Sequence, residues 1–356
     1  MTEAAVEEAA PRARVRRETP YQVWQKGEGI PINRGSYVED LYHLDVAPWP
    51  RLGQRGAFVN LADQEEDDGW VIELAPGGQT DVLHHLFEAT ILILEGRGAT
   101  SFWQKGGPKQ TVEWQRGSVF SPPLNCYYQH FNLDGQRPAR LFAVTLAPMV
   151  MNLFRNPGFV LGDEYVFADR YGGQDDYFNG PGRRDESRAR EWVTNLVPDI
   201  RTFGLDANDP RGQGSFRLGF TLAGNQMVAH SSEWPTGTYM KGHRHGVGAH
   251  VVILDGIGYS LLWFKGEEPR KVDWKDGSVL SPKDQEFHQH FNSGPTPVRY
   301  LAFRLGAADT RRWLAAAMPD QIESENEDPS IYDLYEAECG RHGVKVTLPR
   351  PGYRRG

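Results

Sequence analysis

The chain has 356 residues, a formal net charge of −8, and 39% hydrophobic residues. This composition is typical of a soluble globular protein with one large or two ordinary domains, and the acidic balance argues against a nucleic-acid-binding surface. No window reaches eighteen consecutive apolar residues, so we expect no membrane span, and the acidic start MTEAAVEEAAP lacks the basic and apolar segments of a signal peptide.

The first 20 residues are polar, with one short basic cluster, RARVRRE at 12–18, and we expect a disordered tail there. Beyond the tail, frequent Gly (39) and Pro (24) favour short strands and tight turns. The only cysteines are Cys126 and Cys339, which is typical of free thiols in a reducing cytosol, so we expect a cytoplasmic protein. No Gly-rich phosphate loop, GxSxG elbow or CxxC pair supports a nucleotide, serine-hydrolase or zinc-finger function.

An internal repeat dominates the rest of the chain. Residues 83–132 align without a gap on residues 243–292, and about twenty of these fifty pairs are identical. EWQRGSVFSPPLNCYYQHFN in the first copy matches DWKDGSVLSPKDQEFHQHFN in the second. This degree of identity indicates a duplication.

Short apolar runs separated by Gly, Pro and Asp turns predict β-strands in both copies. In chain order these runs are TILIL at 90–94, SVFSP at 118–122, HVVIL at 250–254 and RYLAFRL at 299–305. Many short strands without intervening helical patterns favour a sandwich, jelly roll or barrel.

Helices are expected at MVMNLFRN (149–156) and AADTRRWLAAAM (307–318), with a short one near 186–196 in a Gly-, Asp- and Arg-rich connector. The predicted organisation is a tail, a first barrel, a connector, a second barrel, and a C-terminal helix with a tail. Their ranges are 1–20, 21–150, 151–215, 216–306 and 307–356.

Histidines cluster in the second copy, in HRHGVGAH from His243 to His250 and in FHQHFN at His288 and His290. His243 and His245 are two residues apart, so both point to one face of a strand. The five-residue step to His250 is odd, so a regular strand would turn it away, although a bulge at the intervening glycines could bring it back. We predict a metal site, because neutral imidazoles suit Fe, Cu, Ni, Mn or Zn.

The first copy has Leu83, Thr90 and Tyr128 at three of the four corresponding positions, and keeps only His85, opposite His245. This pattern predicts one metallated barrel and one emptied barrel, with one transition metal per chain. His130 survives in the emptied copy opposite His290, which therefore has a structural or supporting role. Four polar residues on or near strands of the second copy are weaker pocket candidates: Gln226, Tyr239, Lys241 and Arg304.

The two segments G-HRHGVGAH-VVILDG and DGSVLSP-KDQEF-H-QHFN resemble the two motifs of the cupin superfamily. The resemblance covers two blocks of about 90 residues and implies a bicupin, an all-β fold of duplicated double-stranded β-helix (jelly-roll) barrels with a few peripheral helices. It implies His243, His245 and His288 as metal ligands. His250 stands where the family has Glu, as a fourth ligand or, pointing into the pocket, as an acid–base group.

Among cupins, the motifs look most like the gentisate, salicylate and 1-hydroxy-2-naphthoate dioxygenase group. That resemblance implies Fe(II), with Cu, Ni, Mn or Zn as alternatives, and a dioxygenase that uses O2 to cleave a C–C bond of a small anionic aromatic or enolisable substrate. An isomerase, lyase or decarboxylase, or a non-catalytic small-molecule-binding cupin, stays open. We also expect a homo-oligomer.

Overall fold

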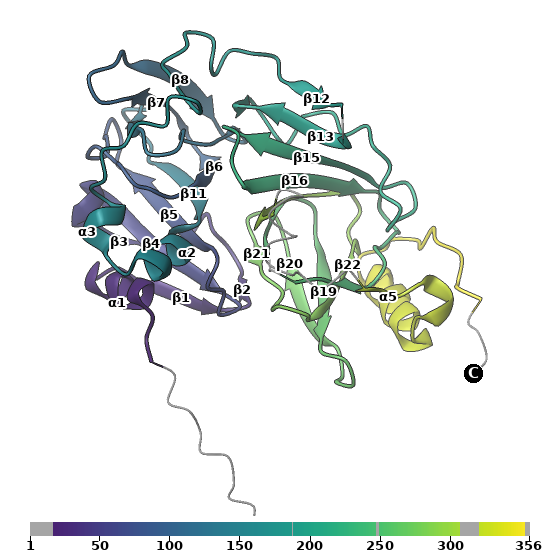
Figure 1. The fold of residues 1–356 in the computed structure, drawn as a ribbon. Helices are drawn as coiled ribbons and strands as arrows, with labels where there is room; N and C mark the ends of the chain where they lie inside the picture. Colours follow the sequence, from purple (N-terminus) through teal and green to yellow (C-terminus); the bar gives the residue numbers. More distant parts are fainter. Residues whose placement is uncertain (1–16, 187, 247–248, 307–319, 353–356) are drawn as a thin grey trace, which may run out of the picture.

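A computed structural model describes residues 17–186, 188–246, 249–306 and 320–352. The chain forms two β-barrels side by side, each made of a larger and a smaller sheet (Figure 1). The fold of duplicated β-barrels expected from the sequence is therefore confirmed. Within the described residues, no helix is long and apolar enough to cross a membrane.

The first barrel is built mainly from the N-terminal half. Its larger sheet has the order β1-β4-β5-β11-β6-β9-β14, with β3 beside β4, and its smaller sheet has the order β10-β7-β8. The strand bounds are β1 (Ile32–Gly35), β3 (Ala47–Trp49), β4 (Gln54–Leu61), β5 (Asp68–Leu74), β6 (Ala89–Glu95), β7 (Arg97–Trp103), β8 (Gln110–Gln115), β9 (Val119–Phe120), β10 (Tyr127–Asn132), β11 (Ala139–Thr145) and β14 (Leu196–Val197).

The second barrel repeats this arrangement. Its larger sheet has the order β12-β13-β15-β16-β23-β18-β21-β2, and its smaller sheet has the order β20-β19-β22-β17-β24. The strand bounds are β2 (Tyr37–Val38), β12 (Arg183–Asp185), β13 (Arg188–Thr194), β15 (Phe216–Leu222), β16 (Met227–Trp234), β17 (His243–Arg244), β18 (His250–Asp255), β19 (Gly258–Trp263), β20 (Arg270–Trp274), β21 (Val279–Leu280), β22 (Phe287–Phe291), β23 (Val298–Leu305) and β24 (Asp320–Gln321).

Each barrel receives a strand from the other half of the chain. β2 pairs with β21 of the second barrel, and β14 pairs with β9 of the first. The segment expected to hold a helix near 186–196 instead forms β13, which pairs in parallel with β15. The helix prediction was wrong there, because pairing with an exposed sheet edge outweighs local sequence preference.

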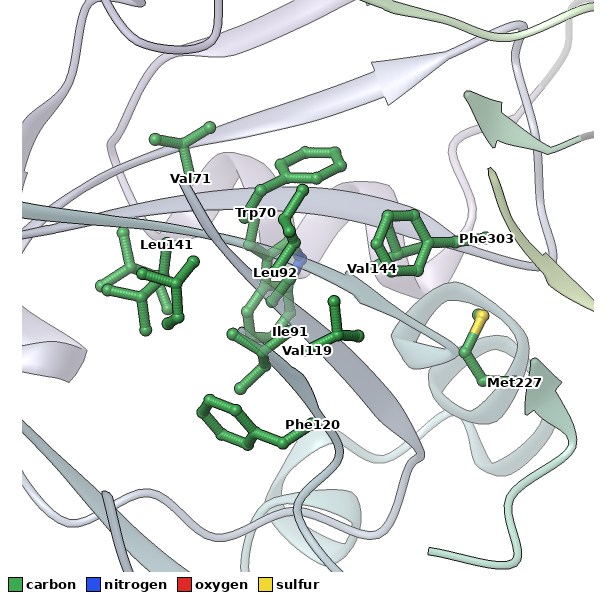
Figure 2. Packing of buried hydrophobic residues seen from close by; sticks show 14 of the residues in the cluster. Trp70, Val71, Ile91, Leu92, Val119, Phe120, Leu141, Val144, Met227 and Phe303 are labelled. Atoms are coloured by element: carbon green, nitrogen blue, oxygen red, sulfur yellow. The ribbon is translucent and has the colours of Figure 1, made fainter. Parts of the chain in front are cut away.

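How deeply a strand is buried depends on whether one of its faces or neither of them is in contact with water. β8 alternates between exposed and buried residues, as expected for a strand with one face in water, whereas β6 and β11 are buried along almost their whole length. Figure 2 shows the reason, since Met227 and Phe303 of the second barrel join the apolar cluster around Ile91 and Leu92 of the first. The core of the first barrel thus extends across the interface between the barrels, while the residues around Trp234 and around Tyr259 form two separate clusters in the second barrel.

The repeated glycines have a steric role at the barrel hairpins. A Cβ on Gly98 would lie 2.1 Å from the carbonyl oxygen of Phe131, and one on Gly258 would lie 2.0 Å from that of Phe291. Any side chain there would push the paired strands apart, which explains why both copies have glycine.

The helices within the described residues lie outside the barrels (Figure 1). They are α1 (Pro20–Gly27), α2 (Ala147–Phe154), α3 (Pro157–Val160) and α5 (Pro329–Arg341), with 3₁₀ turns η1 (Pro50–Leu52) and η2 (Ser324–Asn326). The prediction at 149–156 matches α2, while 1–16 of the expected tail and the helix expected at 307–318 fall outside the described residues. α5 packs at the outer edge of the second barrel, where Tyr335 meets Phe291 (Figure 1).

Candidate metal centre and adjoining cavities

Three histidines of the second barrel converge on one point. His243 on β17 lies directly opposite His288 on β22, and His245 follows two residues later. One nitrogen from each ring lies within 4.8 Å of the other two. The ring centroids of His243 and His288 are 4.2 Å apart, and those of His245 and His288 are 4.9 Å apart. The period-two spacing of His-x-His produces this convergence, because both side chains leave the same face of the strand.

In all three rings, the Nδ1 atom lies close to a backbone carbonyl oxygen. The Nδ1 atom of His243 lies 3.2 Å from the carbonyl oxygen of Lys241, that of His245 lies 3.3 Å from that of Gly246, and that of His288 lies 3.1 Å from that of Glu286. A carbonyl can only accept, so Nδ1 is the donor and carries the proton. The lone pair is then on Nε2, which is the arrangement that orients a histidine toward a metal.

The electrostatics also favour neutral rings. Burial lowers the pKa of His288 to about 4, and burial together with the other histidines lowers the pKa of His243 and His245 well below the usual value. Three neutral imidazoles form a donor set that suits a transition metal better than Mg²⁺ or Ca²⁺.

The structure does not bring His250 to these three residues. It is fully buried on β18, and its Nδ1 atom lies 3.1 Å from Asp67 while its Nε2 atom lies 3.3 Å from the carbonyl oxygen of Val59. Both contacts belong to the first barrel. The predictions of a fourth ligand or a pocket acid–base group are corrected, because β18 lies in the larger sheet and β17 in the smaller one, and the side chain of His250 leaves β18 toward the first barrel.

His290 belongs to a hydrogen-bond relay that recurs in both barrels. In the second barrel, Trp274 donates to Ser260 (2.9 Å), whose hydroxyl lies 2.7 Å from Nδ1 of His290. In the first barrel, Trp114, Thr100 and His130 make the same contacts at the same distances. The repetition in a barrel without the histidine triad supports the structural role inferred from the duplication.

The first barrel shows how the corresponding site is closed. Nε2 of His85 lies 2.8 Å from the hydroxyl of Tyr128, and Leu83 pairs with Tyr128 as His243 pairs with His288. The hydroxyl of Tyr128 thus forms a hydrogen bond with the ring nitrogen of His85 that would otherwise face a metal. In the part of the chain that the structure describes, no second cluster of three ligand-type side chains accompanies the histidine triad.

A cavity of about 30 Å³ adjoins the triad. This volume suffices for about two water molecules. Besides the histidines, its wall includes side chains from the loop before β15 and from β15, β16 and β23. These are Arg211, Arg217, His230, Tyr300 and Arg304.

The wall is strongly basic. Nε of Arg217 and Nδ1 of His230 are buried and make no hydrogen bond with any described residue. Burial and the neighbouring arginines lower the pKa of His230 well below its usual value, so its ring is neutral. A neutral imidazole and several guanidinium groups around one small space provide an environment for an anion.

The four weaker pocket candidates lie at different places in the structure. Arg304 lines this inner cavity, while Tyr239 and Lys241 line a second, outer one. Gln226 lines neither, because it lies in the turn before β16, where its backbone N–H donates to Glu88. The prediction for Gln226 is thus corrected.

Sequence reasoning missed Arg211, Arg217, His230 and Tyr300. An arginine inside the apolar strand FRLGFTL was a usable signal for Arg217. Arg211 lies in a loop, where the sequence gave no signal that it would line a cavity.

Comparison with known proteins supports the fold. No family model and no curated protein sequence matches this chain. Among solved structures, a salicylate 1,2-dioxygenase from Pseudaminobacter salicylatoxidans is similar over 72% of this chain and 75% of that one (14% identity, TM-score 0.53). A Bacillus subtilis oxalate decarboxylase with Mn(II) centres is similar over 84% of this chain and 83% of that one, with 12% identity and a TM-score of 0.52. A hazelnut (Corylus avellana) vicilin is similar over 88% of this chain and 98% of that one, with 8% identity and a TM-score of 0.50. These likenesses show that the chain has the bicupin fold.

Proposed function

We propose that this protein is a metal-dependent enzyme acting on a small anionic substrate. His243, His245 and His288 would hold one transition metal per chain through their Nε2 atoms. The observation that carries the proposal is the triad itself, with each Nδ1 occupied by a backbone carbonyl and each ring neutral.

The metal would supply Lewis acidity or O2 activation at positions that the three imidazoles leave open. The arginines of the inner cavity would bind and orient the substrate's carboxylate by charge-assisted hydrogen bonds. Nδ1 of His230 has no hydrogen-bond partner among the described residues, so the neutral ring would form a hydrogen bond with the bound substrate. The hydroxyl of Tyr300, 3.4 Å from Nε2 of the same ring, would hold that ring in place.

We favour an iron-dependent dioxygenase that cleaves a C–C bond of an aromatic or enolisable acid. Two features support this choice. Three neutral ligands leave the metal's charge uncompensated, which favours an anionic chelating substrate, and a salicylate 1,2-dioxygenase is among the structures of this fold.

A non-oxidative reaction is the second candidate. The small volume of the inner cavity, about 30 Å³, favours a compact acid, and oxalate decarboxylase with Mn(II) shares the fold.

Two measurements test the proposal. Elemental analysis of the untagged protein should find about one equivalent of iron, manganese or another transition metal per chain, and none in a His243→Ala/His288→Ala variant. A panel of small carboxylic acids is then incubated with the metal-loaded protein in air and without O2. Turnover only in air identifies the dioxygenase, and turnover in both identifies the non-oxidative enzyme. Two equivalents of metal, or none after reconstitution, would refute the site.

A further inference from the structure

The smaller sheet of the second barrel ends in a strand with an open edge. β20 (Arg270–Trp274) pairs with β19 on one side, and no described strand pairs with its other side. Such an edge presents N–H and C=O groups that can form hydrogen bonds with a further strand. A groove of about 570 Å³ adjoins it, lined by all of β20, by Lys275 and, from the last strand of the larger sheet and beside it, by Tyr37 and Glu39. The edge therefore has room for another strand, which would lie about 4.8 Å away.

The side chains of β20 alternate between the barrel interior and the outer face of the sheet. Val272 and Trp274 are buried in the interior. Lys271 and Asp273 point to the outer face, where their charged groups lie 2.6 Å apart within one chain. Lys271 also lies 3.1 Å from Glu338 of α5. This edge thus carries a cation and an anion at neighbouring outward positions.

A second copy of the chain is the partner that fits this charge pattern. A two-fold axis perpendicular to the sheet would set two β20 strands antiparallel, with the same edge of each in contact. Directly opposite residues then point to the same face, so outward positions must meet outward positions. A register centred on Lys271 or on Asp273 sets like charges opposite each other. A register centred on Val272 instead sets each Lys271 opposite Asp273 of the partner subunit.

The corresponding edge of the first barrel lacks this pattern. β8 has Thr111 and Glu113 at the positions of the two charged residues of β20. No register of two β8 strands sets opposite charges against each other, because Glu113 is the only charged residue of that strand. The side chain of Gln110 also donates to the carbonyl of Gly173 in the connector, at 3.2 Å, so one end of this edge is already in use. The comparison favours the second barrel as the pairing surface.

We propose that the protein forms a two-fold dimer by antiparallel pairing of β20 with β20 of a second copy. Val272 lies on the axis, and the two five-stranded sheets join into one continuous sheet. Backbone hydrogen bonds hold the strands together, while the two pairs of Lys271 with Asp273 select the register. β19 and β22 separate β20 from β17, so the pairing leaves the histidine triad uncovered and does not depend on the proposed function.

Sedimentation of the full chain over a range of concentrations tests this pairing. The wild type should self-associate to a dimer. Lys271→Asp and Asp273→Lys each set like charges opposite one another at two symmetry-related places, so each should raise the dissociation constant at least about tenfold. The double variant Lys271→Asp/Asp273→Lys restores opposite charges and should return the dissociation constant to within about threefold of the wild type.

Glu113→Lys is the matched control, because it makes the same change at the corresponding exposed position of the first barrel. It should leave self-association unchanged. Asp273→Lys keeps the contact of Lys271 with Glu338, so loss of the dimer in this variant does not come from a detached α5. A wild type that is monomeric at every concentration would overturn the proposal. The same holds if both charge reversals leave the dimer intact, or if the folded double variant fails to recover it.

A second measurement tests the register directly. Residues directly opposite each other have Cβ atoms about 4.5–5.5 Å apart, whereas diagonal neighbours are about 7–8 Å apart, too far for a disulfide. A mixture of Lys271→Cys and Asp273→Cys chains should therefore form a disulfide-linked dimer under mild oxidation, and neither variant should do so alone. The native Cys126 and Cys339 are buried. A link formed by either variant alone would refute the register centred on Val272.

Discussion

Replacing His250 with leucine should destabilise the protein without removing its metal. His250 and Asp67 are both fully buried, 3.1 Å apart, and they join the two barrels. Burial alone would lower the pKa of His250, but contact with Asp67 raises it above its ordinary value, so the imidazolium is favoured. His250→Leu leaves the Asp67 carboxylate buried without its counter-charge.

Breaking a buried pair in this way costs about 3–5 kcal/mol. The loss should be visible as a lower midpoint in urea unfolding at pH 6, with the metal content measured on the same sample. Adding Asp67→Asn removes the uncompensated charge, so the double variant should recover about 1–3 kcal/mol relative to the single one.

Thr90 provides a matched control at the corresponding position of the first barrel. Its hydroxyl lies 3.0 Å from that of Ser121, a neutral contact, so Thr90→Val should cost only about 1 kcal/mol. A His250→Leu protein as stable as the wild type would show that the ion pair contributes nothing. A stable protein that has lost its metal would return His250 to the ligand set.

His243→Ala, His245→Ala and His288→Ala should each abolish stoichiometric metal binding while circular dichroism stays native, and a variant that retains a full equivalent would remove that residue from the site. His290→Ala should keep the metal and lose about 1–3 kcal/mol in urea unfolding, because the hydroxyl of Ser260 loses a partner; metal loss in a folded His290→Ala protein would contradict this. Burial raises the pKa of Asp68 to about 7, so the folded state binds a proton that the unfolded state releases near pH 4. Stability should therefore fall as the pH rises from about 4 to about 7, and Asp68→Asn should flatten this dependence; an identical pH profile in the variant would exclude Asp68 as its source.

The two copies of the repeat, compared residue by residue, predict much of the metal site. The period-two spacing of His243 and His245 places both on one face, and the replacement of His288 by Tyr128 in the first copy identifies the emptied barrel. These inferences depend on local geometry and on side-chain identity, which a sequence contains. The hydrogen bond between His85 and Tyr128 gives the chemical reason for the replacement.

The direction of His250 shows where the resemblance to cupins failed. His250 begins β18 of the larger sheet, whereas His243 and Arg244 form β17 of the smaller sheet, so the two segments do not form one regular strand. The family pattern placed a ligand at this position, but the structure turns the side chain toward Asp67 of the other barrel. Only the packing of the two barrels supplies a partner there, and that partner comes from a distant part of the chain.

The remaining features depend on long-range pairing. Arg211 reaches both cavities from a loop, and residues 188–194 become a strand because an open sheet edge is beside them. β2 and β14 each pair with the barrel formed by the opposite half of the chain. The sequence by itself determined the duplicated β fold and the histidine triad, because the alternation of short strands and the comparison of the two copies are both contained in it. Tertiary structure alone decided the charged cavity walls and the exchanged strands, because these contacts join segments whose proximity no local pattern encodes.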